Sequence, residues 1–362
     1  MRVAILGAGA GGAAAAAEIA LAGREVVLWN RSAETLKPFQ EQEGVAYEGV
    51  LGSGLVRLER ITPDLQEVAR EADVAVVTLP TFTHRQLAGA LAKAGWPAQR
   101  PIVLNPGHTG GALEFAAAFG EVRPDVPPIA EFSTLTYVAR KYEPGKVTVT
   151  GRAKRVRAAA LPGGQSALET AEALFPSADR VGDVLAADLA NVNMVLHPPG
   201  AILGAAWVEA RRGDFTFYVD AMTLGVARVM RRLDDERRQV AAAFGHELPS
   251  LIGEMRRIGT VEDNGAGADD FVAAISGGEA NRRIRAPDSL QHRYYREDFG
   301  HGLLPFVELA AIAGVETPVG RALLDVAEAA VGIDYRTDGR TAARMGIQGL
   351  TRNELLNRVR GQ

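Results

Sequence analysis

The chain has 362 residues, of which 47% are hydrophobic, and this is enough for two domains with sizeable cores. Its formal net charge of −4 leaves no positive field that would attract nucleic acid or an anionic membrane. The sequence has no cysteine, which excludes disulfides and thiolate metal sites, and its six histidines show no ligand spacing. We therefore expect neither a metal nor a nucleic acid as a partner.

The first residues, MRVAILGAGA, have too short an apolar run and too many glycines for a signal peptide. No stretch approaches the roughly 18 apolar residues that a membrane helix needs. These two observations predict a cytoplasmic protein that does not contact membranes.

The stretch RVAILGAGAGGAAAAAEIALAGREVVLWNRS predicts a strand, a tight turn, a helix and a second strand in sequence. Gly7 permits the tight turn, Gly9 lets the backbone approach a pyrophosphate, and Gly12 lets the helix pack against the sheet. The helix N-terminus, from Ala10 onward, offers free N–H groups and a positive dipole end. We therefore expect Gly7, Gly9, Ala10 and Gly12 to bind a dinucleotide.

The end of the second predicted strand bears on the choice of cofactor. An NAD-binding protein usually has Asp or Glu here, which accepts hydrogen bonds from the ribose hydroxyls. This chain has Asn30 and Arg31 instead, so no carboxylate repels a 2′-phosphate, and Arg31 can pair with one. The two residues favour NADP, while NAD use stays open.

Further strands follow in the order expected of a doubly wound parallel sheet. ADVAVVTLP predicts a strand ending at Leu79 and Pro80, and RPIVLNPG predicts another that ends at Asn105. Ligands in such sheets lie beyond the carboxyl ends of the strands, so these three residues are expected beside the cofactor. PPIAEFSTLTYVAR and GKVTVTGRAK predict later strands, the second of them an outer one.

From about Asp183 onward, segments with helical spacing replace the strand-like runs. The sequence therefore predicts an α/β Rossmann domain over residues 1–180 and an all-helical domain over residues 181–362. One long helix is expected in the segment from Phe217 through Met222 to a stop at Gly245, and two more are expected on either side of Pro318. The Gly-, Asp- and Asn-rich segment 261–289 predicts a mobile connection with a short helix.

The segment NMVLHPPGAIL places His197 on an apolar run that two prolines are expected to stop. A lone histidine on such a segment is more often structural than catalytic. His197 lies near the start of the helical domain, however, and the later stretch QHRYYREDFGHG offers polar partners. His197 is therefore a candidate acid–base facing a substrate.

The chain resembles the octopine/nopaline (opine) dehydrogenase family over nearly its whole length, in the ordered stretches NPGHTGGALEF, AEFSTLTYVAR, NVNMVLHPPGAIL, GDFTFYVDAMTLGVARVMRRLDDERRQVAAAFG and HRYYREDFGHGLLP. The resemblance implies a second domain like the C-terminal domain of 6-phosphogluconate dehydrogenase. It also implies the reductive condensation of an amino acid with a 2-oxo acid by NADH or NADPH. The family's catalytic pair would fall on His197 and Asp298, and its substrate-binding arginine on Arg293.

That chemistry agrees with the residue types present. An amine and a keto acid form a carbinolamine, which must lose water to give the imine that is reduced. These proton transfers need a group that titrates near neutral pH, and an aspartate can hold a histidine in the right tautomer. A guanidinium can grip a substrate carboxylate through two hydrogen bonds.

Two other functions stay open. One is a Rossmann reductase of a 2-oxo acid or sugar phosphate, of the glycerol-3-phosphate or ketopantoate type, but such enzymes often use a lysine, and no lysine follows Lys154. The other is a non-catalytic NADP-sensing protein, which would not need His197, Arg293 and Asp298 together. Apolar faces expected on the helical domain favour a homodimer. The sequence names neither the amino acid nor the keto acid.

Overall fold

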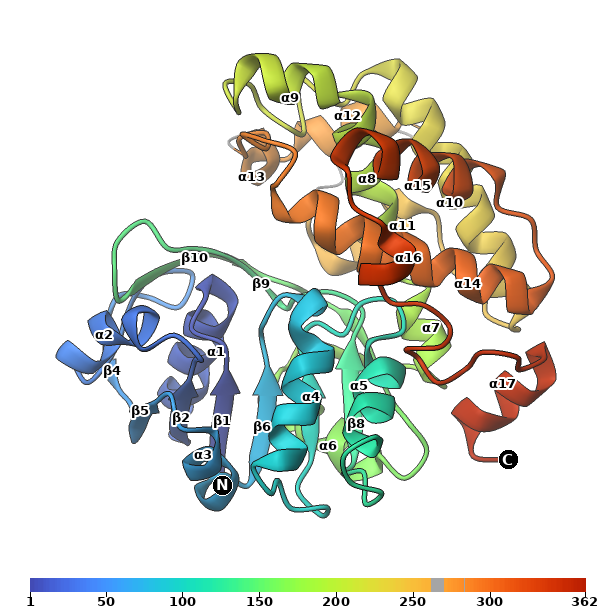
Figure 1. Ribbon diagram of the computed structural model, residues 1–362. Coiled ribbons are helices and arrows are strands. Elements are labelled where there is room, and N and C mark those ends of the chain that lie inside the picture. The colour runs from blue at the N-terminus through green and yellow to red at the C-terminus, as the bar shows by residue number, and fades with distance from the viewer. Residues whose placement is uncertain (262–269, 283) are drawn as a thin grey trace. The chain divides into compact units, whose positions relative to one another are not determined.

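The computed structural model describes residues 1–261, 270–282 and 284–362. The chain forms two compact units, of which the first contains Met1–Gly107 and Gly111–Val184. The second contains Leu185–Gln362 and also the three residues His108–Gly110. The first unit is built on a parallel sheet and the second is helical, so the predicted fold class is confirmed (Figure 1).

The main sheet of the first unit has eight strands. All neighbouring pairs are parallel except β8 with β11. In spatial order the strands are β12 (Ala178–Arg180), β11 (Val156–Ala160), β8 (Ile129–Phe132), β7 (Ile102–Leu104), β6 (Val74–Val77), β1 (Arg2–Leu6), β2 (Glu25–Trp29) and β5 (Arg60–Thr62).

The strand order reverses between β1 and β6, because the chain runs from β1 to one edge of the sheet and from β6 to the other. Leu6 and Val77 are partners in the register of this pair, so the two strands end side by side. Ligands of open α/β sheets bind at this kind of reversal. β6 ends at Val77 rather than at the predicted Leu79 and Pro80, because Pro80 already begins a short helical turn.

Seven helical segments accompany this sheet, and helices lie on both of its faces (Figure 1). They are α1 (Ala10–Leu21), α2 (Ala33–Glu41), α3 (Leu65–Glu71), η1 (Thr81–Thr83), α4 (His84–Lys93), α5 (Gly111–Gly120) and α6 (Gln165–Leu174).

A second sheet packs on α1, and the sequence did not predict it. Its four strands are β4 (Gly54–Arg57), β3 (Gly44–Gly49), β10 (Lys146–Arg152) and β9 (Tyr137–Arg140), in spatial order. Residues of α1, of the main sheet and of this second sheet share one core. The alanine run of α1 is explained by this position, since a helix covered on two sides has room only for small side chains.

Two strand predictions are corrected by the second sheet. GKVTVTGRAK is not an outer strand, because β10 lies between β3 and β9 and pairs with both. PPIAEFSTLTYVAR is not one strand either. Its first half is β8 of the main sheet, its second half is β9 of the second sheet, and residues 133–136 connect them.

Helices follow the last strand, which ends at Arg180. They are α7 (Val184–Asp188), α8 (Asn193–Leu203), α9 (Ala205–Arg211), α10 (Leu224–Ala243), α11 (Leu251–Ile258), α12 (Phe271–Gly277), α13 (Glu279–Arg282), η2 (Tyr294–Leu303), α14 (Leu304–Ala313), α15 (Pro318–Val331), α16 (Tyr335–Asp338) and α17 (Arg352–Arg360). The break before Pro318 and the stop near Gly245 agree with the sequence prediction. Of the segment 261–289, the structure describes α12 and α13, and residues 262–269 and 283 lie outside the described part.

The long helix begins later than predicted. Thr223 caps the N-terminus of α10 by accepting a hydrogen bond from the Val226 amide. Phe217 and Met222 therefore precede the helix, and the Phe217 amide donates instead to the carbonyl of Ile284 at 3.0 Å. The cap and this bond together turn the chain out of helical geometry before Leu224.

The prediction that two prolines stop the segment after His197 is wrong, because α8 continues through Pro198 and Pro199 to Leu203. Each proline lacks the amide that would bond one turn back. The helix tolerates this loss because its central part is buried against other helices, which fix its path. Among the described residues, no helix is long and apolar enough to cross a membrane.

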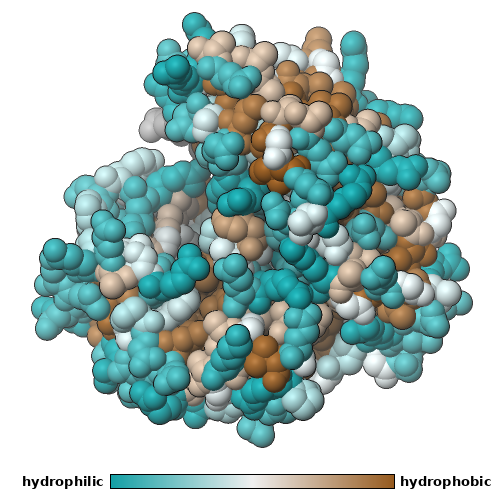
Figure 2. All heavy atoms as spheres, viewed as in Figure 1, coloured by the Kyte–Doolittle hydropathy of each residue, from teal (hydrophilic) through white to brown (hydrophobic). Residues whose placement is uncertain are grey.

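The helical unit exposes several large apolar side chains, namely Leu203, Trp207, Val219, Leu224 and Val326. Figure 2 shows apolar atoms gathered on the visible face of this unit. An exposed apolar surface of this kind could be buried in the interface of the predicted homodimer. The homodimer itself stays a prediction.

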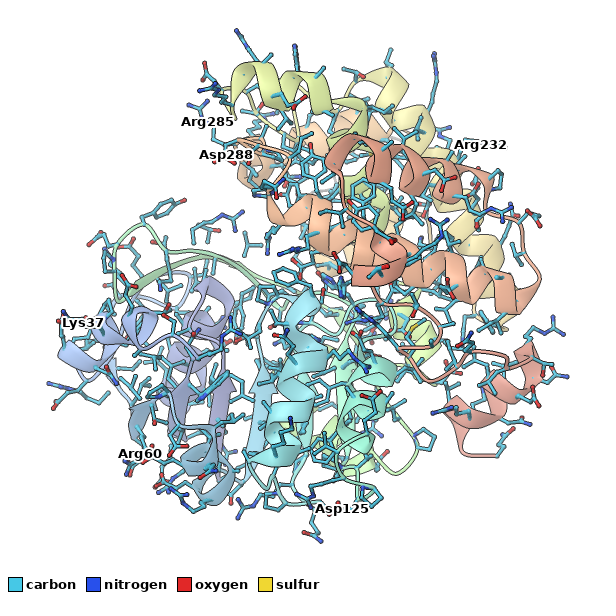
Figure 3. All side chains as sticks on the ribbon, viewed as in Figure 1. Lys37, Arg60, Asp125, Arg232, Arg285 and Asp288 are labelled. Carbon is cyan, nitrogen blue, oxygen red and sulfur yellow. The ribbon has the colours of Figure 1, made fainter. Side chains whose placement is uncertain are left out.

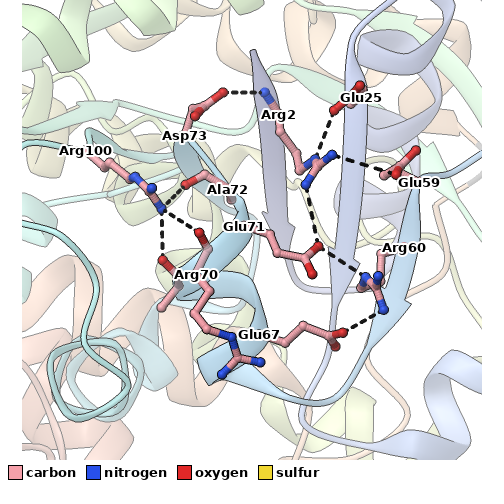
Figure 4. Close-up of polar contacts among 11 residues, drawn as sticks. Arg2, Glu25, Glu59, Arg60, Glu67, Arg70, Glu71, Ala72, Asp73 and Arg100 are labelled. Carbon is pink, nitrogen blue, oxygen red and sulfur yellow. Dashed lines mark hydrogen bonds and ion pairs between the residues drawn. The ribbon is translucent and has the colours of Figure 1, made fainter.

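Charged residues occupy the amino ends of the strands in the first unit (Figure 4). The Arg2 guanidinium donates to Glu25 at 2.9 Å and lies 3.7 Å from both Glu59 and Glu71. Arg60 donates to Glu71 at 3.2 Å. These exposed pairs hold strand ends and α3 together at the amino edge of the sheet, where each contributes little to stability.

A glycine-to-alanine pair tests the packing of α1. A Cβ on Gly12 would lie 1.7 Å from the Gly7 carbonyl oxygen, whereas a Cβ on Gly89 of α4 would meet nothing nearer than 3.9 Å. Gly12→Ala is expected to lower the free energy of unfolding by about 1–3 kcal/mol because the turn must shift. Gly89→Ala is expected to leave it unchanged or raise it, since alanine favours helix. Urea denaturation of both variants measures this, and equal effects would contradict the close approach.

Candidate active site

The glycine turn after β1 has the geometry of a dinucleotide site. Gly7 adopts φ +129°, which favours glycine, and its amide donates to the Trp29 carbonyl at 2.9 Å. A Cβ on Gly12 would collide with the Gly7 carbonyl oxygen. Because glycine has no Cβ, α1 can start this close to β1. At Gly9, in contrast, a Cβ would meet no described atom within 4 Å.

Open space in front of Gly9 is where the pyrophosphate of a dinucleotide approaches the backbone. α1 begins at Ala10, its first turn contains no acidic residue, and the first amides of a helix have no intrahelical acceptor. A phosphate would therefore meet free donors and the positive end of the helix dipole. The residues present fit such a cofactor.

The end of β2 offers a cation and no acid. Asn30 accepts a hydrogen bond from the Ser32 amide at 3.0 Å, and Ser32 caps α2 by accepting from the Thr35 amide. Arg31 is exposed, and no ion pair involves it within the described parts of the chain. This guanidinium is free to meet an anionic ligand.

The other predicted cofactor residues differ in their surroundings. Leu79 and Pro80 follow β6 and are partly exposed, and the Leu79 side chain lies against Gly7. Asn105 is fully buried, and its side-chain amide donates to Thr136 at 2.9 Å and accepts from the Thr136 amide at 3.2 Å. Asn105 therefore fixes the turn between β8 and β9.

His197 and Asp298 lie together in the second unit, although 101 residues separate them in the sequence. The Nδ1 atom of His197 on α8 is 2.9 Å from the Oδ2 atom of Asp298 on η2. The two residues are only 5% and 3% exposed, so the bond is shielded from water. The predicted contact between these side chains is present.

An aromatic group that the sequence did not single out surrounds the imidazole. The Nε2 atom of His197 is 2.7 Å from the Tyr218 hydroxyl, and the ring of Tyr294 stacks on the imidazole with centroids 4.1 Å apart. Phe217 meets the imidazole edge-on at 6.0 Å. Burial and the neighbouring Tyr294 raise the pKa of Tyr218 well above its usual value, so its hydroxyl keeps a proton to donate.

The segment that carries Tyr218 is anchored on both sides. The Ala286 amide donates to Phe215 at 2.9 Å, and Asp220 accepts from the Thr216 amide at 2.7 Å. Arg285, labelled in Figure 3, forms an ion pair with Asp214 at 3.0 Å. These bonds hold the hydroxyl of Tyr218 against His197.

Arg293 directly precedes η2, five residues before Asp298. Its guanidinium is 3.7 Å from the buried Glu297 carboxylate and 5.9 Å from the ring centre of Tyr294. The side chain is 59% exposed, so it can reach a ligand that approaches the stacked rings. Its position agrees with a carboxylate-binding role.

His108 is another buried histidine that the sequence did not single out, although it lies in NPGHTGG. Its Nε2 atom is 3.4 Å from the Asn193 amide nitrogen, one turn before His197 on α8. Burial lowers the pKa of His108, although Glu297 and Asp298 oppose the shift. His108 is therefore neutral near pH 7, and it has no positive charge with which to bind an anion.

Within the described residues, no group of three or more His, Asp or Glu could hold a metal ion.

Comparisons with known proteins agree with this arrangement. Residues 180–331 match the model of the NAD/NADP octopine/nopaline dehydrogenase alpha-helical domain. Residues 2–113 match that of the NAD-dependent glycerol-3-phosphate dehydrogenase N-terminus. The chain is 34% identical to the opine dehydrogenase of Arthrobacter sp. (strain 1C) over 350 residues, or 96% of each protein. It is 25% identical to the vitopine synthase of Allorhizobium ampelinum over 376 residues, or 99% of each.

Solved structures share the fold over the whole chain. Octopine dehydrogenase with NADH and L-arginine superposes with a TM-score of 0.79 at 21% identity, covering 100% of this chain and 98% of that one. Yersinopine dehydrogenase with NADP+ gives a TM-score of 0.74 at 15% identity, with the same coverage. Because the 34% identity extends over both units, the chain belongs to the opine dehydrogenase family of NAD(P)-dependent oxidoreductases.

Proposed function

We propose that His197, held by Asp298, is the acid–base of a reductive condensation between an amino acid and a 2-oxo acid. The observation that carries the proposal is the 2.9 Å bond between two buried side chains in a helical unit of this family. Bound NADPH would supply the hydride that reduces the imine. Gly7, Gly9, Ala10 and Gly12 would hold its phosphates, with Leu79 and Pro80 beside them.

The dyad would act when the carbinolamine loses water. A leaving hydroxyl needs a proton, and a protonated imidazole held by Asp298 can provide one. In the neutral state Nδ1–H donates to Asp298, so Nε2 is the nitrogen that exchanges a proton. Arg293 would grip one substrate carboxylate through two hydrogen bonds.

Tyr218 extends this proton path, because its hydroxyl already contacts Nε2. A proton leaving Nε2 would pass to the Tyr218 oxygen while the phenolic proton moves to the leaving hydroxyl, which departs as water. The path needs no exposure of the imidazole, and this agrees with the burial of His197. Tyr218 would then be the group that touches the reacting oxygen.

Ketone reduction is the second candidate. A ketopantoate reductase from Ralstonia eutropha has a TM-score of 0.63 at 20% identity, so its fold is similar. The second unit contains no lysine, however, because the last lysine in the chain is Lys154. A lysine acid–base is therefore excluded there, and the histidine chemistry is favoured. A homodimer and a cytoplasmic location remain predictions of the sequence.

Removal of the imidazole tests the acid–base role. His197→Ala is expected to lower kcat by about 100- to 10,000-fold without changing cofactor affinity, and Asp298→Asn should have a similar effect. Arg293→Ala should mainly raise the KM for the substrate whose carboxylate Arg293 binds. The assay follows NADPH oxidation with the amino acid and keto acid pair that a screen identifies. His246→Ala, a histidine after α10, is the control, and an unchanged kcat in His197→Ala would refute the mechanism.

Tyr218→Phe tests the relay. The change keeps the aromatic packing and removes only the hydroxyl on Nε2, so kcat should fall about 10- to 100-fold with little change in KM. Tyr295→Phe is the matched control, because it removes a buried hydroxyl that bonds the Ala201 carbonyl. If both variants retain full kcat, Tyr218 only packs against His197.

Arg31 tests the cofactor preference. Because Arg31 is an exposed cation at the end of β2, we expect tighter binding of NADPH than of NADH. Arg31→Ala should weaken NADPH binding by about 1–3 kcal/mol and leave NADH nearly unchanged. Fluorescence titration measures both, with Arg24→Ala at the opposite end of the same strand as the control. Equal losses for the two cofactors would mean that Arg31 does not read the 2′-phosphate.

A further inference from the structure

Lys141 reaches the glycine turn from the second sheet. It directly follows β9, on the connection to β10. Its ammonium donates to the Ala8 carbonyl at 3.1 Å and lies 4.7 Å from the ring centre of Phe39 on α2. Ala8 stands between Gly7 and Gly9, so a cation that is distant in the sequence lies on the cofactor turn itself.

No carboxylate pairs with this ammonium within the described residues. The contrast with Lys146 on the same hairpin is direct, because Lys146 contacts Glu48 at 2.8 Å and Glu143 at 3.2 Å. Lys37 on α2, labelled in Figure 3, is 72% exposed and therefore hydrated. Lys141 is half-buried, and its pKa is lowered by that burial with no acid to compensate.

A partly desolvated ammonium that has no carboxylate partner is stabilised when an anionic ligand binds beside it. Lys141 touches the glycine turn on one side and α2 on the other. Arg31 directly precedes the capped start of α2. The adenosine ribose of a dinucleotide lies between the glycine turn and the end of β2, whereas the pyrophosphate lies at the N-terminus of α1. The phosphate nearest to both cations is thus the one on the ribose.

We propose that Lys141 is the second cation of the 2′-phosphate site. Arg31, which follows β2, and Lys141, which follows β9, would then both bind the 2′-phosphate of NADPH. This rests on the proposed NADPH preference and adds a residue to it. The guanidinium offers a planar fork and the ammonium a compact charge, and a phosphate with nearly two negative charges can accept both. The second sheet would then contribute directly to cofactor choice.

The test compares Lys141→Met with Lys146→Met. Both changes keep an unbranched side chain and remove the charge, but only Lys141 lies on the glycine turn. Titration with NADPH, NADH and adenosine 2′,5′-bisphosphate is followed by fluorescence or calorimetry, so no substrate is needed. Lys141→Met should raise the Kd for NADPH and for the bisphosphate about tenfold or more, and leave that for NADH within about twofold. Lys146→Met should leave all three unchanged.

Lys141→Arg keeps the charge and should retain most of the affinity for NADPH, which separates loss of charge from misfolding. An equal loss of NADPH and NADH in Lys141→Met would place the ammonium on the shared pyrophosphate and overturn the proposal. Unchanged NADPH binding would overturn it as well. In either case, a loss of affinity for NADPH but not for NADH in Arg31→Ala would still support the NADPH preference. Wild-type protein that binds NADH more tightly than NADPH would refute the preference itself.

Discussion

The hydrogen bond between His197 and Asp298 joins two helices in the buried part of the helical unit. A buried carboxylate costs several kcal/mol unless hydrogen bonds satisfy it, and here the imidazole nitrogen of His197 lies 2.9 Å away. The bond ties α8 to η2, and three aromatic rings close around it. Because the same imidazole is bonded at both nitrogens, its tautomer and its orientation are fixed before any substrate binds.

Several of these features follow from the sequence because they rest on local rules. A buried strand followed by Gly7, Gly9 and Gly12 leaves few alternatives to the observed turn. The choice of Asp298 as the partner of His197, in contrast, came from family resemblance, since spacing alone cannot pair residues 101 positions apart. The structure adds the geometry of that pair, and its catalytic role remains a proposal.

Other features could not be predicted, and each has a physical reason. The second sheet joins β3 to β10 across about a hundred residues, and a pattern read along the chain does not reveal such pairing. η2 is a π-helix, whose i→i+5 bonds place residues five apart within it, such as Tyr294 and Phe299, near one face. A helix read with a period of 3.6 would separate them. Tyr218 and Lys141 lie outside helices and strands, where side-chain direction has no period.

The three residues His108–Gly110 have a consequence for folding. They belong to the helical unit, yet they are synthesised long before α8 and the rest of that unit. The Gly110 amide donates to Asp188 at 2.7 Å, and Arg340, fully buried, donates to the Thr109 carbonyl across 231 residues. Closing so long a loop is slow, so the unit matures only after nearly all of the chain has been made. A fragment that starts at Leu185 lacks these acceptors and donors, so Asp188 and Arg340 lose these two hydrogen bonds in it.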